Sequence, residues 1–337
     1  MQSIVLPKIS LVMPVLNGAQ TIEKALQSVF AQQYPNLELI VIDAGSTDGT
    51  VDCIKRYESA ITYWHSRPDG GPIIGANMGI EKATGELVAL LMADDWYEQE
   101  TLRKIGEGLL KHPSADIISC GGRIVEYDHQ IQQYKAKWVY ASANKMELNF
   151  RNICYDVSSA ICCRFIRKSL FQRIGPFIPL DSKNKPMLSN DKEFLLRAMI
   201  HQVKHVYVEH IGHNYLAHAG SSTFGNHKEN ILKLCYEHIE TIESHLKKHQ
   251  QLLSKKQKIG LVYWYVDQST RLVLYKLLDF KFSVAFRVMK RGLKKYHIVW
   301  IIGSIETSCR IILKRSFRLI SKMTNMEIMR RWLGTHL

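Results

Sequence analysis

Short apolar runs alternate with amphipathic stretches through the first hundred residues of the chain. After the first run, a turn at Asn17-Gly18 leads into apolar residues at helical spacing, as at Ile22, Leu26 and Val29. The strand-length runs are residues 9–15, 37–42, 61–64 and 87–92, and the helical stretches are 22–30, 51–57 and 74–83. Strands that alternate with helices predict an α/β fold with a mostly parallel, Rossmann-like sheet flanked by helices.

The pattern changes further along the chain. Residues 115–127 contain two strand-like runs on either side of Gly121-Gly122, and an apolar strand at 157–166 precedes a helix at Lys168–Ile174. After Asn226 only long helical patterns remain. The sequence therefore predicts an α/β domain over residues 1–225 and an all-helical C-terminal region over residues 226–337.

Acidic residues follow three of the predicted strands. Asp43 comes after the second strand, Asp69 lies in the loop after the third, and Asp94-Asp95 follows the fourth. Ligands of open α/β sheets bind beyond the carboxyl ends of the strands, so these acids are expected to share one site. An oxygen-only acid pair suits a hard cation such as Mg²⁺ or Mn²⁺. The alternatives are that Asp94-Asp95 caps a helix and that Asp69 only forms a turn.

The order and spacing of these motifs resemble glycosyltransferase family 2. The matching segments are Pro14-Val15-Leu16-Asn17, Asp43-Ala44-Gly45-Ser46-Thr47-Asp48, Asn77-Met78-Gly79-Ile80 and Leu90-Leu91-Met92-Ala93-Asp94-Asp95. The resemblance runs from residue 9 to residue 220 and does not include the C-terminal helices. It implies a GT-A fold and an inverting enzyme of the hexosyltransferase type, which moves a sugar from a nucleotide diphosphate donor to an acceptor hydroxyl.

The resemblance also implies roles for single residues. Asp43 would contact the base of the nucleotide, which in this family is most often uridine, and Asp94 would contact the ribose. Asp95 would bind the metal that bridges the diphosphate, where a cation stabilises the charge of the departing nucleotide. The second metal ligand would be His218, in a segment similar to the late His-x-x-Ser motif of the family. The other donor-binding candidates are Pro14, Asn17, Ser46 and Asp69.

Two further groups of metal-ligand residue types lie in the same half of the chain. The spacing of His201, His205, His210 and His213 crosses a strand and two turns and has no paired Cys or HExxH context. These histidines are therefore expected to be structural or exposed. The adjacent Cys162-Cys163 are expected to be small hydrophobic residues of a strand.

Asp191 is the candidate catalytic base. It begins a predicted helix in Asn190-Asp191-Lys192-Glu193, and Arg197 follows six positions later. The family usually carries an acid pair at this place, often Glu-Asp, and here Asn190 replaces the Glu. An inverting displacement needs a carboxylate that accepts the proton of the acceptor hydroxyl. The alternative is that Asp191 only caps its helix.

The net charge of +14 is concentrated near the C-terminus, where residues 281–337 hold 13 Lys and Arg against 2 Glu. Apolar residues such as Val284, Val288 and Ile298 are interleaved with basic ones such as Lys290. Basic amphipathic helices bind anionic membranes, and a solvated face of a helical bundle is the alternative. Many members of the family glycosylate lipid-linked intermediates, so the resemblance implies a glycan or lipid-linked acceptor.

Seven scattered cysteines without CxxC spacing indicate a reducing compartment. No secretory signal is evident, and the longest apolar stretch of the C-terminal region, residues 298–305, is far shorter than the roughly 20 residues of a spanning helix. The protein is expected in the cytoplasm, with the basic helices as a peripheral contact to the inner face of the cell membrane.

Other function classes fit the sequence less well. The acidic strand ends would repel phosphate and no recognition motif accompanies the basic residues, so no nucleic-acid partner is expected. A dinucleotide dehydrogenase needs Gly-x-Gly-x-x-Gly after its first strand, where this chain has Pro14-Val15-Leu16-Asn17-Gly18. A relative that binds a nucleotide sugar without transferring it remains an alternative.

Overall fold

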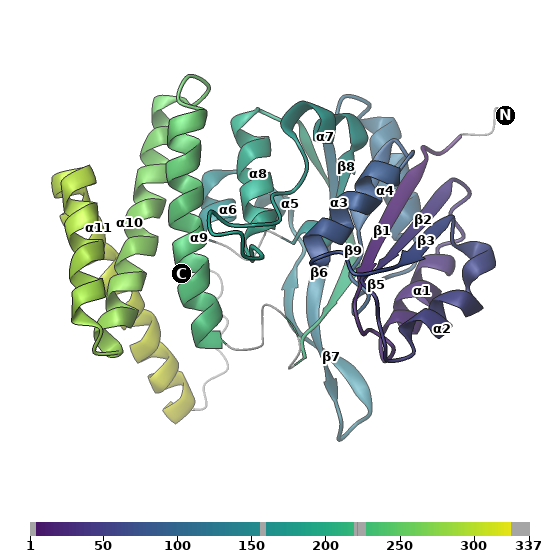
Figure 1. The fold of residues 1–337 in the computed structure, drawn as a ribbon, viewed down its shortest axis with the longest axis horizontal. Helices are drawn as coiled ribbons and strands as arrows, with labels where there is room; N and C mark the ends of the chain where they lie inside the picture. The colour runs from purple at the N-terminus through teal and green to yellow at the C-terminus, as the bar shows by residue number, and fades with distance from the viewer. Residues whose placement is uncertain (1–4, 156–159, 219–220, 222–226, 325–337) are drawn as a thin grey trace. The chain divides into compact units, whose positions relative to one another are not determined.

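The computed structural model describes residues 5–155, 160–218, 221 and 227–324. The chain divides into two compact units, unit 1 of residues 1–230 and unit 2 of residues 231–337. Unit 1 contains the sheet and unit 2 is helical (Figure 1). The mixed α/β architecture with a helical C-terminal region confirms the predicted fold class.

Four parallel strands form one half of the nine-stranded sheet of unit 1. These strands are β1 (Ile9–Val15), β2 (Leu37–Asp43), β3 (Tyr63–Ser66) and β4 (Leu87–Leu90). The order along the sheet is β3-β2-β1-β4-β8-β6-β9-β5, and β7 pairs with β6 outside this path. Because β1 pairs in parallel with both β2 and β4, the loops that follow these strands leave the same edge of the sheet.

The other half of the sheet is mostly antiparallel. Its strands are β5 (Trp96–Tyr97), β6 (Ile117–Asp128), β7 (Gln133–Tyr140), β8 (Arg164–Arg167) and β9 (His205–Leu216). Strand β8 runs antiparallel to β4 and β6, β9 runs parallel to β6, and β5 runs antiparallel to β9. Strands β6 and β7 form a hairpin that projects from the rest of unit 1 in Figure 1.

Helices cover both faces of the parallel strands because successive side chains of a strand point to opposite faces. Leu11 and Met13 of β1 belong to the core that includes residues of α1 (Ile22–Phe30) and α4 (Thr101–Lys111). On the other face, α3 (Pro72–Lys82) packs so closely that a Cβ at Gly79 would lie 2.3 Å from Val12 Cγ1. The remaining helical segments of unit 1 are α2 (Thr50–Arg56), η1 (Glu58–Ala60), α5 (Ala143–Met146), α6 (Phe150–Tyr155), η2 (Ile161–Cys163), α7 (Lys168–Ile174) and α8 (Asn190–Ile200).

Two of the predicted elements differ from the structure. Gly121-Gly122 lies inside β6 rather than between two strands. The glycines allow a close approach of the facing segment, since a Cβ at either position would come within 2.8 Å of Tyr140 or Ala141. The described part of the predicted strand at 157–166 forms the short helix η2 at Ile161–Cys163 before β8 begins.

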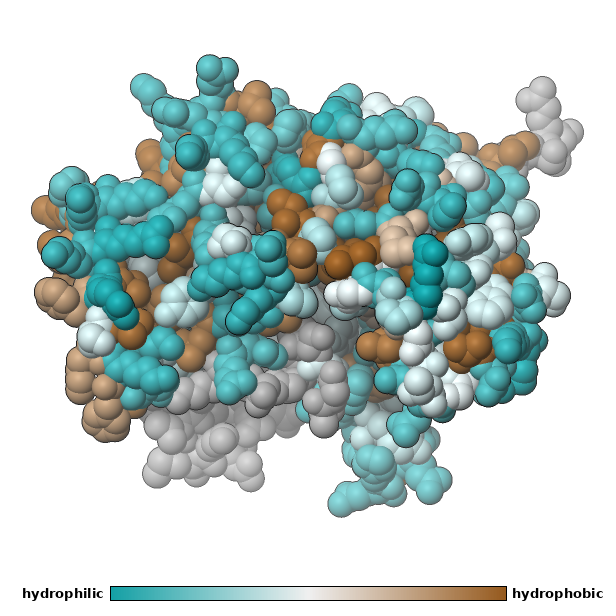
Figure 2. All heavy atoms as spheres, viewed as in Figure 1, coloured by the Kyte–Doolittle hydropathy of each residue, from teal (hydrophilic) through white to brown (hydrophobic). Residues whose placement is uncertain are grey.

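Unit 2 consists of α9 (His227–Lys248), whose first residues belong to unit 1, α10 (Lys255–Leu278) and α11 (Phe282–Thr324). Helix α11 is kinked at His297, whose φ of 45° is not helical. Buried Trp264 and Tyr265 contribute to the core of the unit. Figure 2 shows apolar side chains on the outer edge of α11. Within the described residues, no helix is both long and apolar enough to cross a membrane.

Candidate active site

The loops after β1 and β2 are tied together by hydrogen bonds. Asn17 has a left-handed backbone with a φ of 50°. Its side-chain oxygen accepts from the backbone N–H of Thr47 at 3.0 Å, and its own N–H donates to the Ser46 hydroxyl at 2.7 Å. The next N–H, of Gly18, donates to Thr50 Oγ1 at 2.8 Å. Two predicted donor-binding residues, Asn17 and Ser46, are therefore in direct contact.

Asp43 lies at the carboxyl end of β2, and its side chain is buried. Its carboxylate accepts from the backbone N–H groups of Gly45 and Ser46, at 3.1 and 2.9 Å. It also accepts from the hydroxyls of Ser46 and Ser66, the latter at 2.6 Å. These donors hold the carboxylate in one orientation against the Ser46 loop. Pro14 lies in β1 beside this end of β2, beyond the last β1 residue that pairs with β4, so its missing N–H breaks no bond to β4.

Asp69 lies between β3 and α3. Its Oδ1 accepts from the backbone N–H of Gly71 at 2.8 Å. Gly70 and Gly71 have φ values of 87° and 140°, which side chains with a Cβ rarely adopt. A Cβ at Gly75 would lie 2.4 Å from Asp69 Oδ2, so only glycine leaves room for the carboxylate beside the first turn of α3. Asp69 therefore forms the turn that starts this helix.

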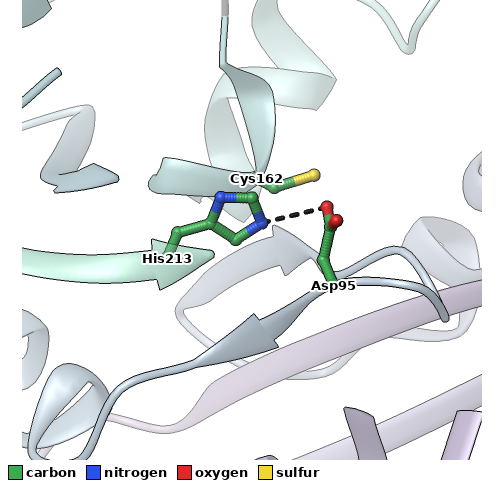
Figure 3. A group of neighbouring side chains, drawn as sticks. All are labelled: Asp95, Cys162 and His213. Carbon is green, nitrogen blue, oxygen red and sulfur yellow. Dashed lines mark hydrogen bonds and ion pairs between the residues drawn. The ribbon is translucent and has the colours of Figure 1, made fainter. Parts of the chain in front are cut away.

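The adjacent acids Asp94 and Asp95 face different environments. The Asp94 carboxylate is partly exposed and lies 3.0 Å from Nε2 of His218. The Asp95 side chain is fully buried, and its Oδ1 accepts from the backbone N–H of Leu216 at 3.0 Å. Its Oδ2 lies 3.1 Å from Nε2 of His213 (Figure 3). The two predicted metal ligands, Asp95 and His218, thus have different partners in this structure.

Asp95, Cys162 and His213 form a buried cluster whose ligand atoms all lie within 4.8 Å of one another (Figure 3). Burial raises the pKa of Asp95, and the nearby His213 opposes this effect. Burial also raises the pKa of the Cys162 thiol. Nδ1 of His213 has no hydrogen-bond partner among the described residues, so a neutral ring protonated at Nε2 leaves no buried donor unpaired. A mixed sulfur, nitrogen and oxygen ligand set suits Zn²⁺ better than Mg²⁺ or Mn²⁺.

Asp191 lies in the first turn of α8, whose N-cap residue is Ser189. Its side chain is partly buried, and its Oδ1 accepts from the backbone N–H of Lys192 at 2.7 Å. Arg164 of β8 is fully buried, which lowers the pKa of its guanidinium to about 10, while the charge of Asp191 acts in the opposite direction. The Arg164 guanidinium is therefore within electrostatic range of Asp191.

The second acid of the same turn has a structural partner. Glu193 is buried and forms an ion pair with Arg197 at 2.7 Å. Arg197 also donates to the backbone oxygens of Ile174 and Pro176, the latter at 2.8 Å. This buried pair anchors α8 to the end of α7, which leaves Asp191 as the partly exposed acid of the first turn.

Comparison with known proteins decides the family. Residues 10–175 match the family model described as glycosyl transferase family 2. The chain contains a glycosyltransferase family 2 domain. An uncharacterized glycosyltransferase of Rickettsia typhi is 30% identical over 173 residues, which are 51% of this chain and 54% of the relative. A PGL/p-HBAD biosynthesis glycosyltransferase of Mycobacterium tuberculosis is 29% identical over 175 residues, 51% of this chain and 63% of the relative. The match thus spans little more than half the length of these relatives.

Solved structures of glycosyltransferases share the fold of this chain. TarS 1–349 of S. aureus, solved in complex with UDP-GlcNAc, has a TM-score of 0.53 and 17% identity, with 86% of this chain and 89% of TarS covered. The mannosyltransferase PcManGT of Pyrobaculum calidifontis, solved with GDP-Man and Mn²⁺, has a TM-score of 0.54 and 15% identity, with 89% and 86% covered. At these identities the likeness establishes the GT-A fold alone.

The sequence motifs of family 2 lead to most of the residues at this edge of the sheet, but not to all of them. His213 and Cys162, expected to be structural, are the neighbours of Asp95. No local motif signals this contact, because Asp95 and His213 are 118 positions apart. Their proximity depends on the pairing of β5 with β9, which aligns Tyr97 with His213.

Proposed function

We propose that this chain transfers a sugar, with inversion at the anomeric carbon, from a nucleoside diphosphate donor to an acceptor hydroxyl. The observation that carries the proposal is the convergence of Asn17, Ser46, Asp43 and Asp94 on loops that leave one edge of the sheet. A ligand that binds beyond the carboxyl ends of these strands meets all four. The glycosyltransferase family 2 domain supports this activity.

In the proposed reaction the Asp191 carboxylate accepts the proton of the acceptor hydroxyl. The acceptor oxygen forms a bond to the anomeric carbon as the bond from that carbon to the β-phosphate oxygen breaks, and the nucleoside diphosphate leaves with the electron pair. The buried pair of Glu193 and Arg197 fixes the helix that presents Asp191. General-base catalysis of this kind contributes about 10²–10⁴ in rate.

We propose Mg²⁺ or Mn²⁺ as the cofactor, held by Asp95 and His218, with Asp94 at the ribose of the donor. The partly exposed His218, whose Nε2 lies 3.0 Å from the Asp94 carboxylate, fits a cation that must also bind phosphate oxygens. Both oxygens of the buried Asp95 carboxylate already accept a hydrogen bond, so Asp95 would bind the cation through a remaining lone pair or in place of the bond to His213. A bound cation would offset the charge of the leaving diphosphate. The Mn²⁺ and GDP-Man in the PcManGT structure support a divalent cation.

A donor panel tests the proposal. UDP-sugars are the proposed donors, and GDP-mannose is the comparison, since TarS was solved with UDP-GlcNAc and PcManGT with GDP-Man. The assay measures nucleotide release in Mn²⁺, with and without glycan acceptors. We expect release from one UDP-sugar that chelation of the metal abolishes. Binding without release from any donor would contradict catalysis and favour a nucleotide-sugar-binding role.

We further propose that unit 2 contacts an anionic membrane, where a lipid-linked or polysaccharide acceptor is assembled. Phe280, Phe282 and Phe286, at the start of α11, are 80%, 59% and 65% exposed. Lys281 and Arg287 lie among them in the sequence. Exposed aromatic residues next to basic ones suit the interface of an anionic leaflet, where rings enter the headgroup layer and cations meet the lipid charge. In this proposal the protein lies peripherally at the inner face of the cell membrane.

A further inference from the structure

A pocket of about 670 Å³ lies beside the predicted donor site in unit 1. Four segments line it, namely the turn from β1 into α1, the turn before α2, the β6–β7 hairpin and the end of β9. It shares Asn17 and His218 with the predicted donor and metal residues, but Asp43, Asp69, Asp94 and Asp95 are not among its described lining residues. The pocket thus adjoins the donor site and shares two residues with it.

Aromatic side chains form the wall that the hairpin contributes. The ring of Tyr127 lies 5.0 Å from that of His129 and 5.2 Å from that of Tyr134, both edge to face. The ring of Tyr134 lies 4.8 Å from that of Trp96. The ammonium group of Lys24 lies 3.1 Å from the centre of the Trp96 ring and 3.3 Å from that of the Tyr134 ring. Lys24 and Trp96 therefore fix the inner end of the wall, while Tyr127 is 40% exposed.

The polar lining of the pocket suits a neutral ligand with many hydroxyl groups. No Lys or Arg is among its described lining residues, whereas Asp48 and Glu126 are. Glu126 is ion-paired with Lys137, so the described lining offers a diphosphate none of the free cations that it requires. The side chains of Gln20, Tyr127 and Tyr134 have no hydrogen-bond partner among the described residues, so they can donate to and accept from a ligand.

We propose that this pocket binds a neutral sugar unit of the acceptor glycan, with the ring of Tyr127 stacked against the sugar. Pyranose rings present apolar C–H faces to aromatic rings, while their hydroxyls bind amides and carboxylates at the edge. His218 belongs to both the pocket and the proposed metal site, because it lines the pocket and its Nε2 lies 3.0 Å from the Asp94 carboxylate. The inference rests on the proposed function, since it takes the bound sugar to be part of an acceptor.

The test compares wild type with Tyr127→Ala and with the control Trp138→Ala. Trp138 lies on the same hairpin and is 42% exposed, close to the 40% of Tyr127, but it does not line the pocket. The probes are maltotriose, mannotriose and chitotriose, each titrated by saturation-transfer NMR in the presence of Mg²⁺ and UDP. Calorimetry measures the affinity of UDP for the same three proteins.

We expect wild type and Trp138→Ala to bind one of the trisaccharides while UDP is bound. Tyr127→Ala should bind it about tenfold more weakly, which corresponds to about 1.4 kcal/mol, with unchanged affinity for UDP. Tyr127→Phe should retain the affinity if stacking carries it. Gln20→Ala gives a second weakened variant on a different wall of the pocket.

The inference would be overturned by the absence of trisaccharide binding to wild type, by displacement of the trisaccharide by UDP, or by an equal loss of binding in Trp138→Ala and Tyr127→Ala. A loss of UDP affinity in Tyr127→Ala would make the pocket part of the donor site and would likewise overturn it. Failure of wild type to bind any nucleotide, with trisaccharide binding intact, would contradict the proposed function instead and support the saccharide pocket.

Discussion

Replacement of Asp95 by Asn should destabilise the protein far more than the same change at Asp94. The Asp95 carboxylate accepts from the backbone N–H of Leu216 and from the ring of His213 in a fully buried place. Asn has the same shape but one acceptor oxygen, so one of the two donors would face an NH₂ group. A buried donor without an acceptor costs about 1–3 kcal/mol. The partly exposed pair of Asp94 and His218 is worth only about 0–1 kcal/mol.

Urea unfolding at pH 7.5, without metal or nucleotide, measures this difference. We expect Asp95→Asn to lose about 1–3 kcal/mol of the free energy of unfolding. The matched control Asp94→Asn should lose no more than about 1 kcal/mol. Equal losses in the two variants would refute the reasoning, because they would mean that the Asp95 carboxylate is not the buried acceptor of two hydrogen bonds.

The same variants test the metal assignment. Mn²⁺ with UDP at one hundred times its Kd should stabilise wild type by about 2.7 kcal/mol. If Asp95 binds the cation, the part of this increment that depends on Mn²⁺ should disappear in Asp95→Asn. In Asp94→Asn a metal-dependent part should remain, with weaker UDP binding overall. An undiminished effect of Mn²⁺ on Asp95→Asn would remove Asp95 from the metal site and leave it as the partner of His213.

Asp191→Asn should lower kcat by about 10²–10⁴ at unchanged donor affinity, because the proton acceptor is lost. A transfer assay with near wild-type kcat would leave this residue only a structural role. Burial and a neighbouring guanidinium lower the pKa of His205 to about 3. In the unfolded state His205 has a pKa near 6.5 and therefore binds more protons than in the folded state. Lowering the pH from 7.5 to 5 should reduce the free energy of unfolding by about 2 kcal/mol through this residue. Urea titrations should find this loss reduced in His205→Gln, and equal losses would contradict the buried neutral ring. The double variant Phe280→Ser, Phe282→Ser should co-sediment less with anionic vesicles at low salt than the equally soluble control Ile131→Ser, and equal sedimentation would argue against the membrane contact.

The parallel half of the sheet could be predicted because its strands are buried on both faces. Ile9–Val15 and the other runs are continuously apolar, and glycine-rich or acidic turns punctuate them. The prediction does not include strand β7, because all but the last residue of Gln133–Tyr140 are exposed and no continuous apolar run marks this strand. The glycine pair inside β6 misleads for a physical reason, because it marks a close approach to the facing strand and not a turn.

The candidate site likewise contains residues whose positions could be predicted from the sequence and residues whose positions could not. Asn17, Asp43 and Ser46 follow strands that the sequence defines well, and their loops lie close together because parallel strands end at one edge. The burial of Asp95 could not be read from the sequence, since adjacent acids look equivalent there. It follows from long-range pairing, which brings Cys162 and His213 from distant segments to one place.

Strand β9 connects the two acids of the pair. Its pairing with β5 places His213 next to Asp95, and its last residue, Leu216, donates the N–H that Asp95 accepts. Two residues later, His218 meets Asp94 at the partly exposed side. A ligand that displaces Asp94 or His218 would therefore also act on residues 216–218, in which the Leu216 N–H binds the buried Asp95 carboxylate. Displacing that segment would break a buried hydrogen bond at a cost of about 1–3 kcal/mol, so we expect the end of β9 to resist movement by such a ligand.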